Sequence, residues 1–237
     1  PYPDTDLDDL IRVAPSTAML KAQRALQGDI GSYLGVDAAH LQKVGGHWYY
    51  IIDFKVTSWR GYRTRGGVVP GYIVVDAMDP QAEAEAKLGY QLKYAPEARF
   101  GLDLKRYVYL RFLLGNPWRV EDLTTLEVDN EWNPYYTGTL LRHEVGVVGQ
   151  VVDGVIIVDP QTGDIEKHSV EQTPKWIFRV WSRSLVKKYT DWWGEYQFWD
   201  FWKFEGSAGK RQIYKVNDVV TSEGLAFQVT MTSGGND

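Results

Sequence analysis

Residues 191–205, DWWGEYQFWDFWKFE, combine the two kinds of side chain that act on sugars, aromatic rings and carboxylates. Eight of the fifteen residues are aromatic and four are acidic. Tryptophan faces stack on sugar rings, and two suitably placed carboxylates hydrolyse a glycosidic bond. Asp191 and Glu195 are the candidate pair, although a spacing of four residues on a helix also describes an ordinary solvated edge. A carbohydrate platform or a glycosidase cleft is therefore one interpretation of this segment.

The same rings fit an interface between proteins. Helical spacing places Trp192, Tyr196 and Trp199 on one face, whereas Phe201 and Phe204 point away from it. One domain core does not readily absorb all eight rings, and large exposed aromatic patches mark interaction sites. An interface between units or subunits is our leading interpretation. Two others remain open: a plain core, and a membrane-interface anchor, for which the flanking Lys and Arg residues are absent. The candidate partner-binding or glycan-binding residues are Trp192, Trp193, Tyr196, Trp199, Phe201 and Trp202.

A second segment, WRGYRTR at 59–65, interleaves three arginines with two aromatic residues in a predicted loop bounded by glycine. Such a loop can stack on and pair with RNA or an anionic glycan. Alternatively, it is a solvated loop whose arginines pair with the protein's own acids. The net charge of −5 favours the second interpretation and argues against nucleic acid as a partner. The candidate residues are Trp59, Arg60, Tyr62, Arg63 and Arg65.

Other site chemistry has little support in the sequence. The chain has no cysteine, which excludes thiol catalysis, disulfides and cysteine-ligated metals. The four histidines have no metal-ligand spacing, and no GxSxG motif accompanies His143-Glu144. Oxygens of Asp159, Thr162 and Asp164 could bind calcium, but a plain turn explains them better. We therefore predict no catalytic residue, no metal and no cofactor.

An internal similarity gives the strongest signal about the fold. GYIVVDAMDP begins at Gly71 and GVIIVDPQTGD at Gly154, 83 positions later. An aromatic strand candidate precedes each, and VNDVVTSEGLAFQVTMTS opens a third copy at Val216. The β-branched runs are typical of central strands with both faces covered. Helices are expected at residues 15–27, 81–88, 102–114 and 184–196, although Tyr-Val-Tyr at 107–109 also allows a strand within 102–114.

These patterns predict an α+β fold of repeated antiparallel β-sheet units, each covered by helices. The expected units are residues 1–115, residues 116–210 with the aromatic-rich helix, and residues 211–237 as the start of an incomplete third unit. The spacing of the first two units places the closing strand of the third near residue 240. We therefore expect the parent protein to continue, or another chain to complete the sheet, and the open edge to invite pairing.

The run VDGVIIVDPQTGDIE from Val152, and in part HWYYIIDF and GYIVVDA, resemble PepSY-type domains. The turn after the first of the two β-branched strands lacks Thr-Gly, and long helical stretches separate the strands. The resemblance implies a non-enzymatic module outside the cytoplasm, often in tandem, that holds or inhibits a partner.

Together, the sequence predicts a non-catalytic structural or partner-binding module of a larger exported, envelope-associated or particle-forming assembly. Its partners would be other protein subunits or the rest of its own parent chain, and it would act as an oligomer or assembly component. No run approaches the roughly 18 apolar residues of a membrane span. The alternative is a carbohydrate-binding protein or glycoside hydrolase that uses the Trp-rich segment 191–205.

Overall fold

The structure is a computed structural model of the 237-residue chain. It divides into two compact units, one that ends at Val180 and one that begins at Trp181. Antiparallel sheets and helices make up both, so the chain is α+β as predicted. The residues that the structure describes are 11–26, 28, 30–98, 100–116, 118–145, 149–196, 211–221 and 224–233.

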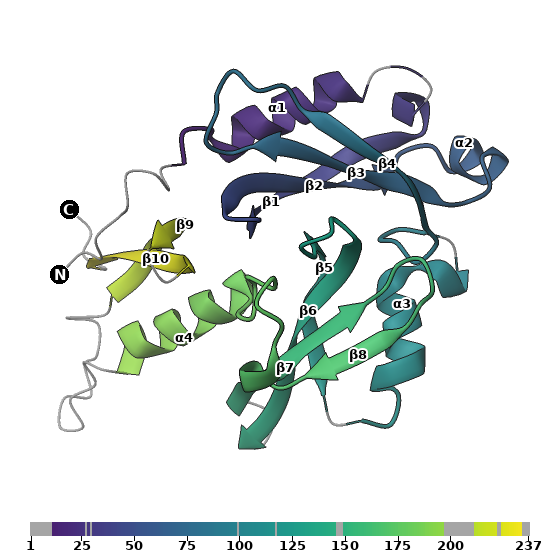
Figure 1. Cartoon of the computed structure of the whole chain (residues 1–237). Helices are drawn as coiled ribbons and strands as arrows, with labels where there is room; N and C mark the ends of the chain where they lie inside the picture. The colour runs from purple at the N-terminus through teal and green to yellow at the C-terminus, as the bar shows by residue number, and fades with distance from the viewer. Residues whose placement is uncertain are drawn as a thin grey trace, which may run out of the picture. The chain divides into compact units, whose positions relative to one another are not determined.

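The first sheet has four antiparallel strands, each hydrogen-bonded to the next along the chain (Figure 1). Its strands are β1 (Leu34–Val44), β2 (His47–Val56), β3 (Val69–Asp76) and β4 (Glu85–Leu92). Gly45 and Gly46 form a two-residue turn between β1 and β2 with φ of 59° and 89°. Positive φ at both positions matches the right-handed twist of the strands and is readily adopted by glycine. The predicted strands at HWYYIIDF and GYIVVD are confirmed as β2 and β3.

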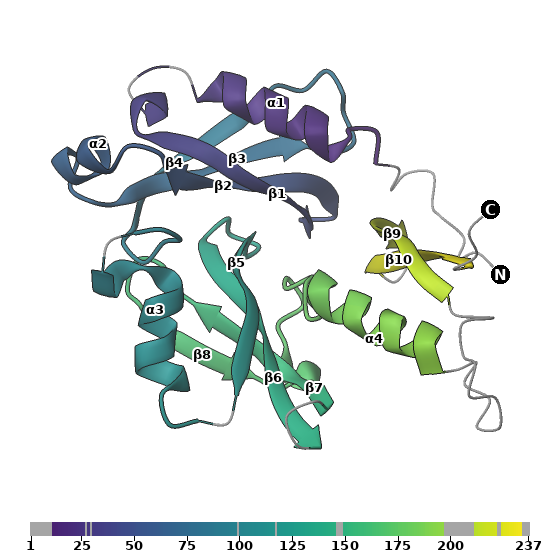
Figure 2. The same cartoon turned by 180° about the vertical axis from the view of Figure 1, so that it is seen from behind.

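Helix α1 (Pro15–Ala25) packs on the first sheet (Figure 2). Pro15 begins the helix, where its missing N–H costs nothing. Ala18 and Ala22 lie one turn apart and are fully buried, so their small side chains let the helix approach the strands closely. The hydroxyl of Tyr50 on β2 donates to the carbonyl of Val13, 2.9 Å away, and fixes the entry to the helix. The predicted helix at 15–27 is therefore confirmed.

The second sheet is again a run of four antiparallel strands in chain order. The strands are β5 (Arg119–Val128), β6 (Pro134–Val145), β7 (Gly149–Val158) and β8 (Ile165–His168). Helix α3 (Leu104–Val108) continues as a π-helical turn, η4 (Tyr109–Leu113), and confirms the helix predicted at 102–114. Short 3₁₀ turns complete this unit at η2 (Ile30–Ser32), η3 (Phe100–Leu102) and η5 (Val170–Gln172).

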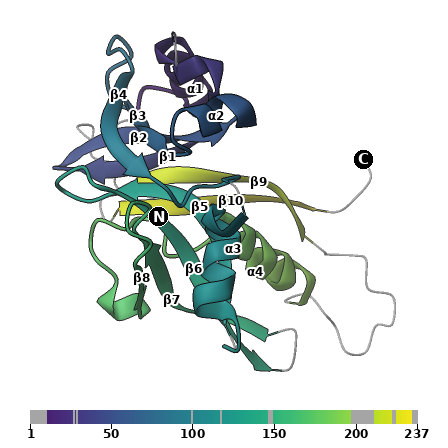
Figure 3. The ribbon, with the colours of Figure 1, turned by 90° about the vertical axis from the view of Figure 1, so that its right-hand side faces the viewer.

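The two faces of the second sheet bury different groups. Helix α3 lies against the second sheet (Figure 3). Its residues Leu104 and Val108 belong to the same buried cluster as Tyr136, Ile156 and Val158, which share one face of the sheet. Because side chains alternate along a strand, the neighbouring residues lie on the opposite face. A separate, smaller cluster covers that opposite face, and it comprises Val155, Ile157 and Ile177 with Tyr135, Trp176 and Val180.

The two sheets of this unit are joined by a shared core and by one buried amide. Gln42 on β1 donates from Nε2 to the carbonyls of Val128, 2.6 Å away, and Trp176, 2.9 Å away. Its Oε1 accepts the N–H of Val128 at 2.9 Å. Gln42 is 1% exposed, so these bonds satisfy an amide that would otherwise be costly to bury.

One predicted element is wrong. Residues 81–88 were expected to form an Ala/Glu-rich helix, but β4 occupies Glu85–Leu92 and pairs with β3. Intrinsic helix preference is worth only tenths of a kcal/mol per residue. Pairing with the edge of β3 gives β4 backbone hydrogen bonds along one of its sides, and this tertiary pairing overrides the local preference.

The C-terminal unit consists of a helix and a hairpin. Helix α4 (Arg183–Tyr196) confirms the helix predicted at 184–196. Strands β9 (Arg211–Thr221) and β10 (Gly224–Ser233) form a two-stranded antiparallel sheet, as the opening at Val216 predicted. Among the helices of the described residues, none is both long and apolar enough to cross a membrane.

Candidate functional site

The predicted aromatic surface lies partly on α4. Trp192 is half-buried and Trp193 is 46% exposed. Tyr189 packs edge-on against Trp192 at 5.6 Å and against Trp181 at 6.1 Å, and the ammonium of Lys188 lies 5.0 Å from the centre of the Trp192 ring. These contacts form an aromatic ladder along α4 that leaves indole surface open to solvent.

The remaining candidates of this segment fall at or beyond the end of the helix. Tyr196 is the last residue of α4, and its side chain lies outside the described part. Trp199, Phe201 and Trp202 also lie outside the described residues. The described structure therefore brings together Trp192 and Trp193, and the combined six-residue surface remains a prediction.

The basic-aromatic segment is a short helix, α2 (Trp59–Thr64), rather than the predicted loop. The hydroxyl of Ser58 accepts the N–H of Gly61 at 3.3 Å and so caps the helix. Tyr62 turns inward and is 1% exposed, so its ring is not available to a ligand. Burial raises the pKa of its phenol to about 12.

The arginines of this segment have separate environments. Arg65 stacks on the ring of Tyr33, with its guanidinium carbon 4.7 Å from the ring centre. Arg60 and Arg63 are exposed, and no described carboxylate pairs with either of them. The exposed face of α2 thus presents Arg60 and Arg63 beside Trp59, whose ring is 38% exposed.

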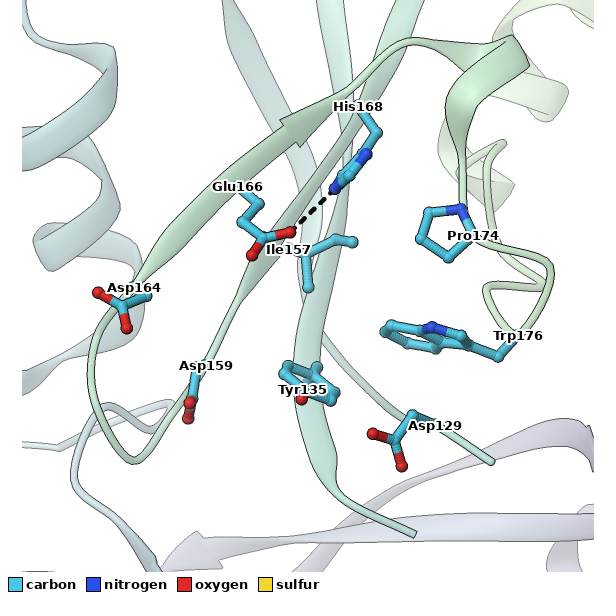
Figure 4. A pocket seen from close by; sticks show the side chains of 9 residues that line it. All are labelled: Asp129, Tyr135, Ile157, Asp159, Asp164, Glu166, His168, Pro174 and Trp176. Atoms are coloured by element: carbon cyan, nitrogen blue, oxygen red, sulfur yellow. Dashed lines mark hydrogen bonds and ion pairs between the residues drawn. The ribbon is translucent and has the colours of Figure 1, made fainter. Parts of the chain in front are cut away.

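A third feature, which the sequence did not single out, is a hollow of about 310 Å³ on the second sheet (Figure 4). It opens on the face of the sheet opposite α3. We call it the second-sheet hollow. Its lining residues are Asp129, Tyr135, Ile157, Asp159, Asp164, Glu166, His168, Pro174 and Trp176.

Turn chemistry places the acids of the second-sheet hollow. Asp159 ends β7 and its Oδ1 accepts the N–H of Gln161 at 2.7 Å, which confirms that this segment is a turn. Thr162 donates its hydroxyl to Asp164 at 2.8 Å in the same turn. Asp129 closes the β5–β6 turn by accepting the N–H of Asn133 at 2.8 Å. Each of these carboxylates keeps acceptor capacity beyond its local bonds.

An aromatic pair forms the wall of the second-sheet hollow. The rings of Tyr135 and Trp176 lie 5.3 Å apart at 34°. Trp176 belongs to the segment after β8, and three side chains of the sheets hold this segment in place. The side-chain amide of Gln42 donates to the carbonyl of Trp176, and the hydroxyl of Thr139 donates to the carbonyl of Val180. The carboxylate of Glu127 accepts the N–H of Arg179 at 3.1 Å. The wall is therefore fixed by three partly buried hydrogen bonds.

The charged side chains of the second-sheet hollow are mostly acidic. Burial, and then the nearby carboxylates of Asp129, Asp159 and Glu166, raise the pKa of Tyr135. The Nε2 atom of His168 lies 3.0 Å from Oε2 of Glu166, within hydrogen-bond range. The lining contains four carboxylates and neither lysine nor arginine. This arrangement suits a ligand with a cationic group and an apolar or aromatic face.

Two buried acids lie elsewhere in the larger unit. Burial, and then the charge of Asp37, raise the pKa of Asp53 to about 7. The N–H of Ala38 donates a hydrogen bond to this carboxylate and so opposes the rise. Burial raises the pKa of Glu127 to about 7 as well, although the guanidinium of Arg179 opposes the shift. The sequence analysis did not identify either acid. The feature that could have indicated them is an acidic residue inside an apolar strand, Asp53 in IIDF and Glu127 in TLEV.

Metal binding was not predicted, and among the described residues no group of three or more His, Asp or Glu is arranged to hold a metal ion. Comparison of the chain with models of known protein families, with curated proteins and with solved structures found no match.

Proposed function

We propose that this chain is a non-catalytic, partner-binding module of a larger assembly, and that it binds by adding a partner's strand to β10. The observation that carries the proposal is the two-stranded sheet of the C-terminal unit. Helix α1 precedes four strands and α3 precedes four strands, whereas α4 precedes the β9–β10 hairpin. An isolated hairpin is marginally stable, and more strands or a covering element are needed.

The internal repeat is part of the same proposal. Under it, β10 takes the position that β2 and β6 have in their sheets. Those strands are hydrogen-bonded on both sides, whereas β10 is paired only with β9 among the described strands. The missing neighbour would be a β-branched strand like β3 or β7. The PepSY-like resemblance, and the extracytoplasmic location that it implies, belong to this proposal.

The composition of β10 supports strand addition. Other edge strands carry charges that discourage pairing, such as Glu85 and Lys87 on β4 and Lys167 on β8. Strand β10, GLAFQVTMTS, has no charged residue and no proline. Phe227 and Val229 are half-buried, whereas the intervening Gln228 is exposed, so the strand has one apolar face. Backbone groups on its outer edge can therefore bind an extended segment.

A peptide with the sequence of residues 152–159 tests the proposal in the full chain, because it copies the strand expected beside β10. We expect it to slow hydrogen exchange of β10 amides. A variant with Gln228→Lys and Thr230→Lys should lose this protection, since edge lysines oppose pairing. The matched control, Lys105→Glu with Arg119→Glu, should retain it. Equal exchange rates with and without peptide would refute strand addition.

The second candidate function is carbohydrate binding at α4. The exposure of Trp181 and Trp193, together with that of the nearby acid Asp191 in the sequence, favours it. It predicts that soluble glycans quench tryptophan fluorescence and that Trp193→Ala reduces the quenching. No response across a broad glycan panel would count against this function and leave strand addition as the proposal.

A further inference from the structure

The site on the first sheet that corresponds to the second-sheet hollow is filled by a tryptophan. Trp132 lies at the β5–β6 turn, and its ring packs edge-on against Tyr49 at 5.2 Å. The ammonium of Lys87 lies 5.4 Å from the centre of the Trp132 ring. The hydroxyls of Tyr72 and Tyr90 donate to the carbonyl of Trp132, at 2.6 and 2.9 Å. An aromatic side chain next to a cation therefore occupies this position.

Two glycines show that the sites on the two sheets correspond. A Cβ on Gly71 would lie 1.9 Å from the carbonyl oxygen of Lys87, and a Cβ on Gly154 would lie 1.9 Å from that of His168. Both glycines have nearly the same φ, 157° and 155°. The same close approach of backbones thus fixes β3 against β4 and β7 against β8. Lys87 and His168 hold equivalent places.

The strand register extends the correspondence to the rest of the site. On the first sheet Tyr49 is opposite Asp76, and Val74 is opposite Glu85. On the second sheet Ile157 is opposite Glu166, and the register that pairs Tyr136 with Val158 places Tyr135 beside Asp159. The second-sheet hollow therefore presents tyrosine, aspartate, an aliphatic residue and glutamate in the register positions that Tyr49, Asp76, Val74 and Glu85 hold on the first sheet, where Tyr49 contacts Trp132.

The differences between the two sites indicate what the second-sheet hollow lacks. Trp176 covers one side of Tyr135 and leaves a space of about 310 Å³, at the small end of ligand pockets. That size suits one or two side chains. The first-sheet site contains Lys87, whereas the second has His168 and four carboxylates with no lysine or arginine. An occupant would have to bring an aromatic ring and its own positive charge.

The chain displays such a group on α2. Trp59 and Arg63 are four residues apart and Arg60 and Arg63 three apart, so helical geometry places the three side chains together. All three side chains are exposed, whereas the side chain of Tyr62 on the same helix is buried in the core. The face has two cations without a described acidic partner, and the lining of the second-sheet hollow has four carboxylates with no lysine or arginine, of which only Glu166 pairs with a histidine, His168.

We propose that the second-sheet hollow of one chain receives the Trp59–Arg60–Arg63 face of a second copy. The indole would pack on Tyr135 and Trp176, and the guanidiniums would pair with Asp164 and Glu166. Because the two surfaces differ, the contact is head-to-tail and can propagate along a row of copies. It uses neither β10 nor α4, so it extends the proposed function without depending on strand addition.

Charge reversal on each surface provides the test. The first variant carries Arg60→Glu with Arg63→Glu, the second carries Asp164→Lys with Glu166→Lys, and Lys105→Glu with Arg119→Glu is the matched control. Light scattering would give the mass of each full-length chain up to about 1 mM, which also covers weak contacts.

We expect the mass of the wild type and the control to rise with concentration. Each charge-reversal variant alone should lose on the order of tenfold or more in association constant, because like charges then meet. An equimolar mixture of the two variants should regain association, since every contact is again between opposite charges, and this recovery also shows that both variants are folded.

Three results would overturn the proposal. One is a wild type that stays monomeric throughout, whether or not its tryptophan fluorescence responds to glycans. Another is undiminished association of both variants, which would attribute self-association to another surface such as β10. The third is a mixture that stays monomeric although each variant has the urea midpoint of the wild type.

Discussion

The stability of the larger unit should fall as the pH rises from 5 to 8. Asp53 and Glu127 are 1% exposed, and burial raises the pKa of each carboxyl to about 7 from reference values of 3.8 and 4.5. In this pH range the unfolded chain releases protons that the folded chain keeps. The free energy of unfolding therefore decreases with pH until the folded carboxyls ionise as well, and it is flat above that point.

The size of the effect follows from the two shifts. One pKa unit corresponds to about 1.36 kcal/mol, so linkage gives a loss of about 2–3 kcal/mol for each group between pH 5 and 8. Together Asp53 and Glu127 contribute a decrease of about 5 kcal/mol. Asp76 and Asp153 act in the opposite direction, because their pKa values are lowered, but their contribution changes below about pH 4.

Urea denaturation at pH 5, 6, 7 and 8 measures the decrease, with circular dichroism as the probe. Asp53→Asn keeps an oxygen for the N–H of Ala38 and cannot ionise, so it should roughly halve the decrease, to about 2–3 kcal/mol. Glu127→Gln should do the same, and the double variant should be nearly flat. A wild-type stability that is constant from pH 5 to 8, or a slope unchanged in Asp53→Asn, would refute the reasoning.

Three further predictions concern stability at a fixed pH. Gln42→Leu should cost about 2–4 kcal/mol in urea denaturation, because it leaves the buried N–H and C=O of Val128 unpaired. Gly154→Ala should cost about 1–3 kcal/mol, since its Cβ would meet a carbonyl oxygen of β8, whereas Gly101→Ala has open space and should be nearly neutral. Tyr62→Phe should be neutral or slightly stabilising, because the buried hydroxyl has no hydrogen-bond partner among the described residues; a loss above about 1 kcal/mol would contradict this.

The sequence was most informative where local chemistry and tertiary structure agree. The β-branched runs before Asp76 and Asp159 became central strands, and the two carboxylates became turn acceptors. Helices with an apolar stripe were also correct, as at Pro15. The helix predicted at residues 81–88 was wrong because local and tertiary preferences disagree there. Residues of β4 pair with the edge of β3, and local composition carries no information about that edge.

The candidate sites were predictable only in part. A run of arginines and aromatics was evident at Trp59–Arg65, but the inward turn of Tyr62 depends on the core beneath α2. The aromatic surplus at 191–205 was evident as well, and Trp193 is exposed as an interaction surface requires. The second-sheet hollow could not be predicted, because its lining comes from three strands, two turns and a segment fixed by Gln42.

The comparison of the two sheets explains how an acidic turn can also become a binding surface. Asp76 and Asp159 each serve first as turn acceptors, and both positions would be needed even in a protein that binds nothing. On the first sheet Trp132 covers the adjacent tyrosine, so the turn acid is part of an internal contact. On the second sheet the same backbone geometry is only half covered by Trp176. The two sheets thus differ in what covers this face: Trp132 packs on Tyr49 of the first sheet, whereas the second sheet leaves four carboxylates beside a partly covered Tyr135, and the proposed occupant has to complement that charge.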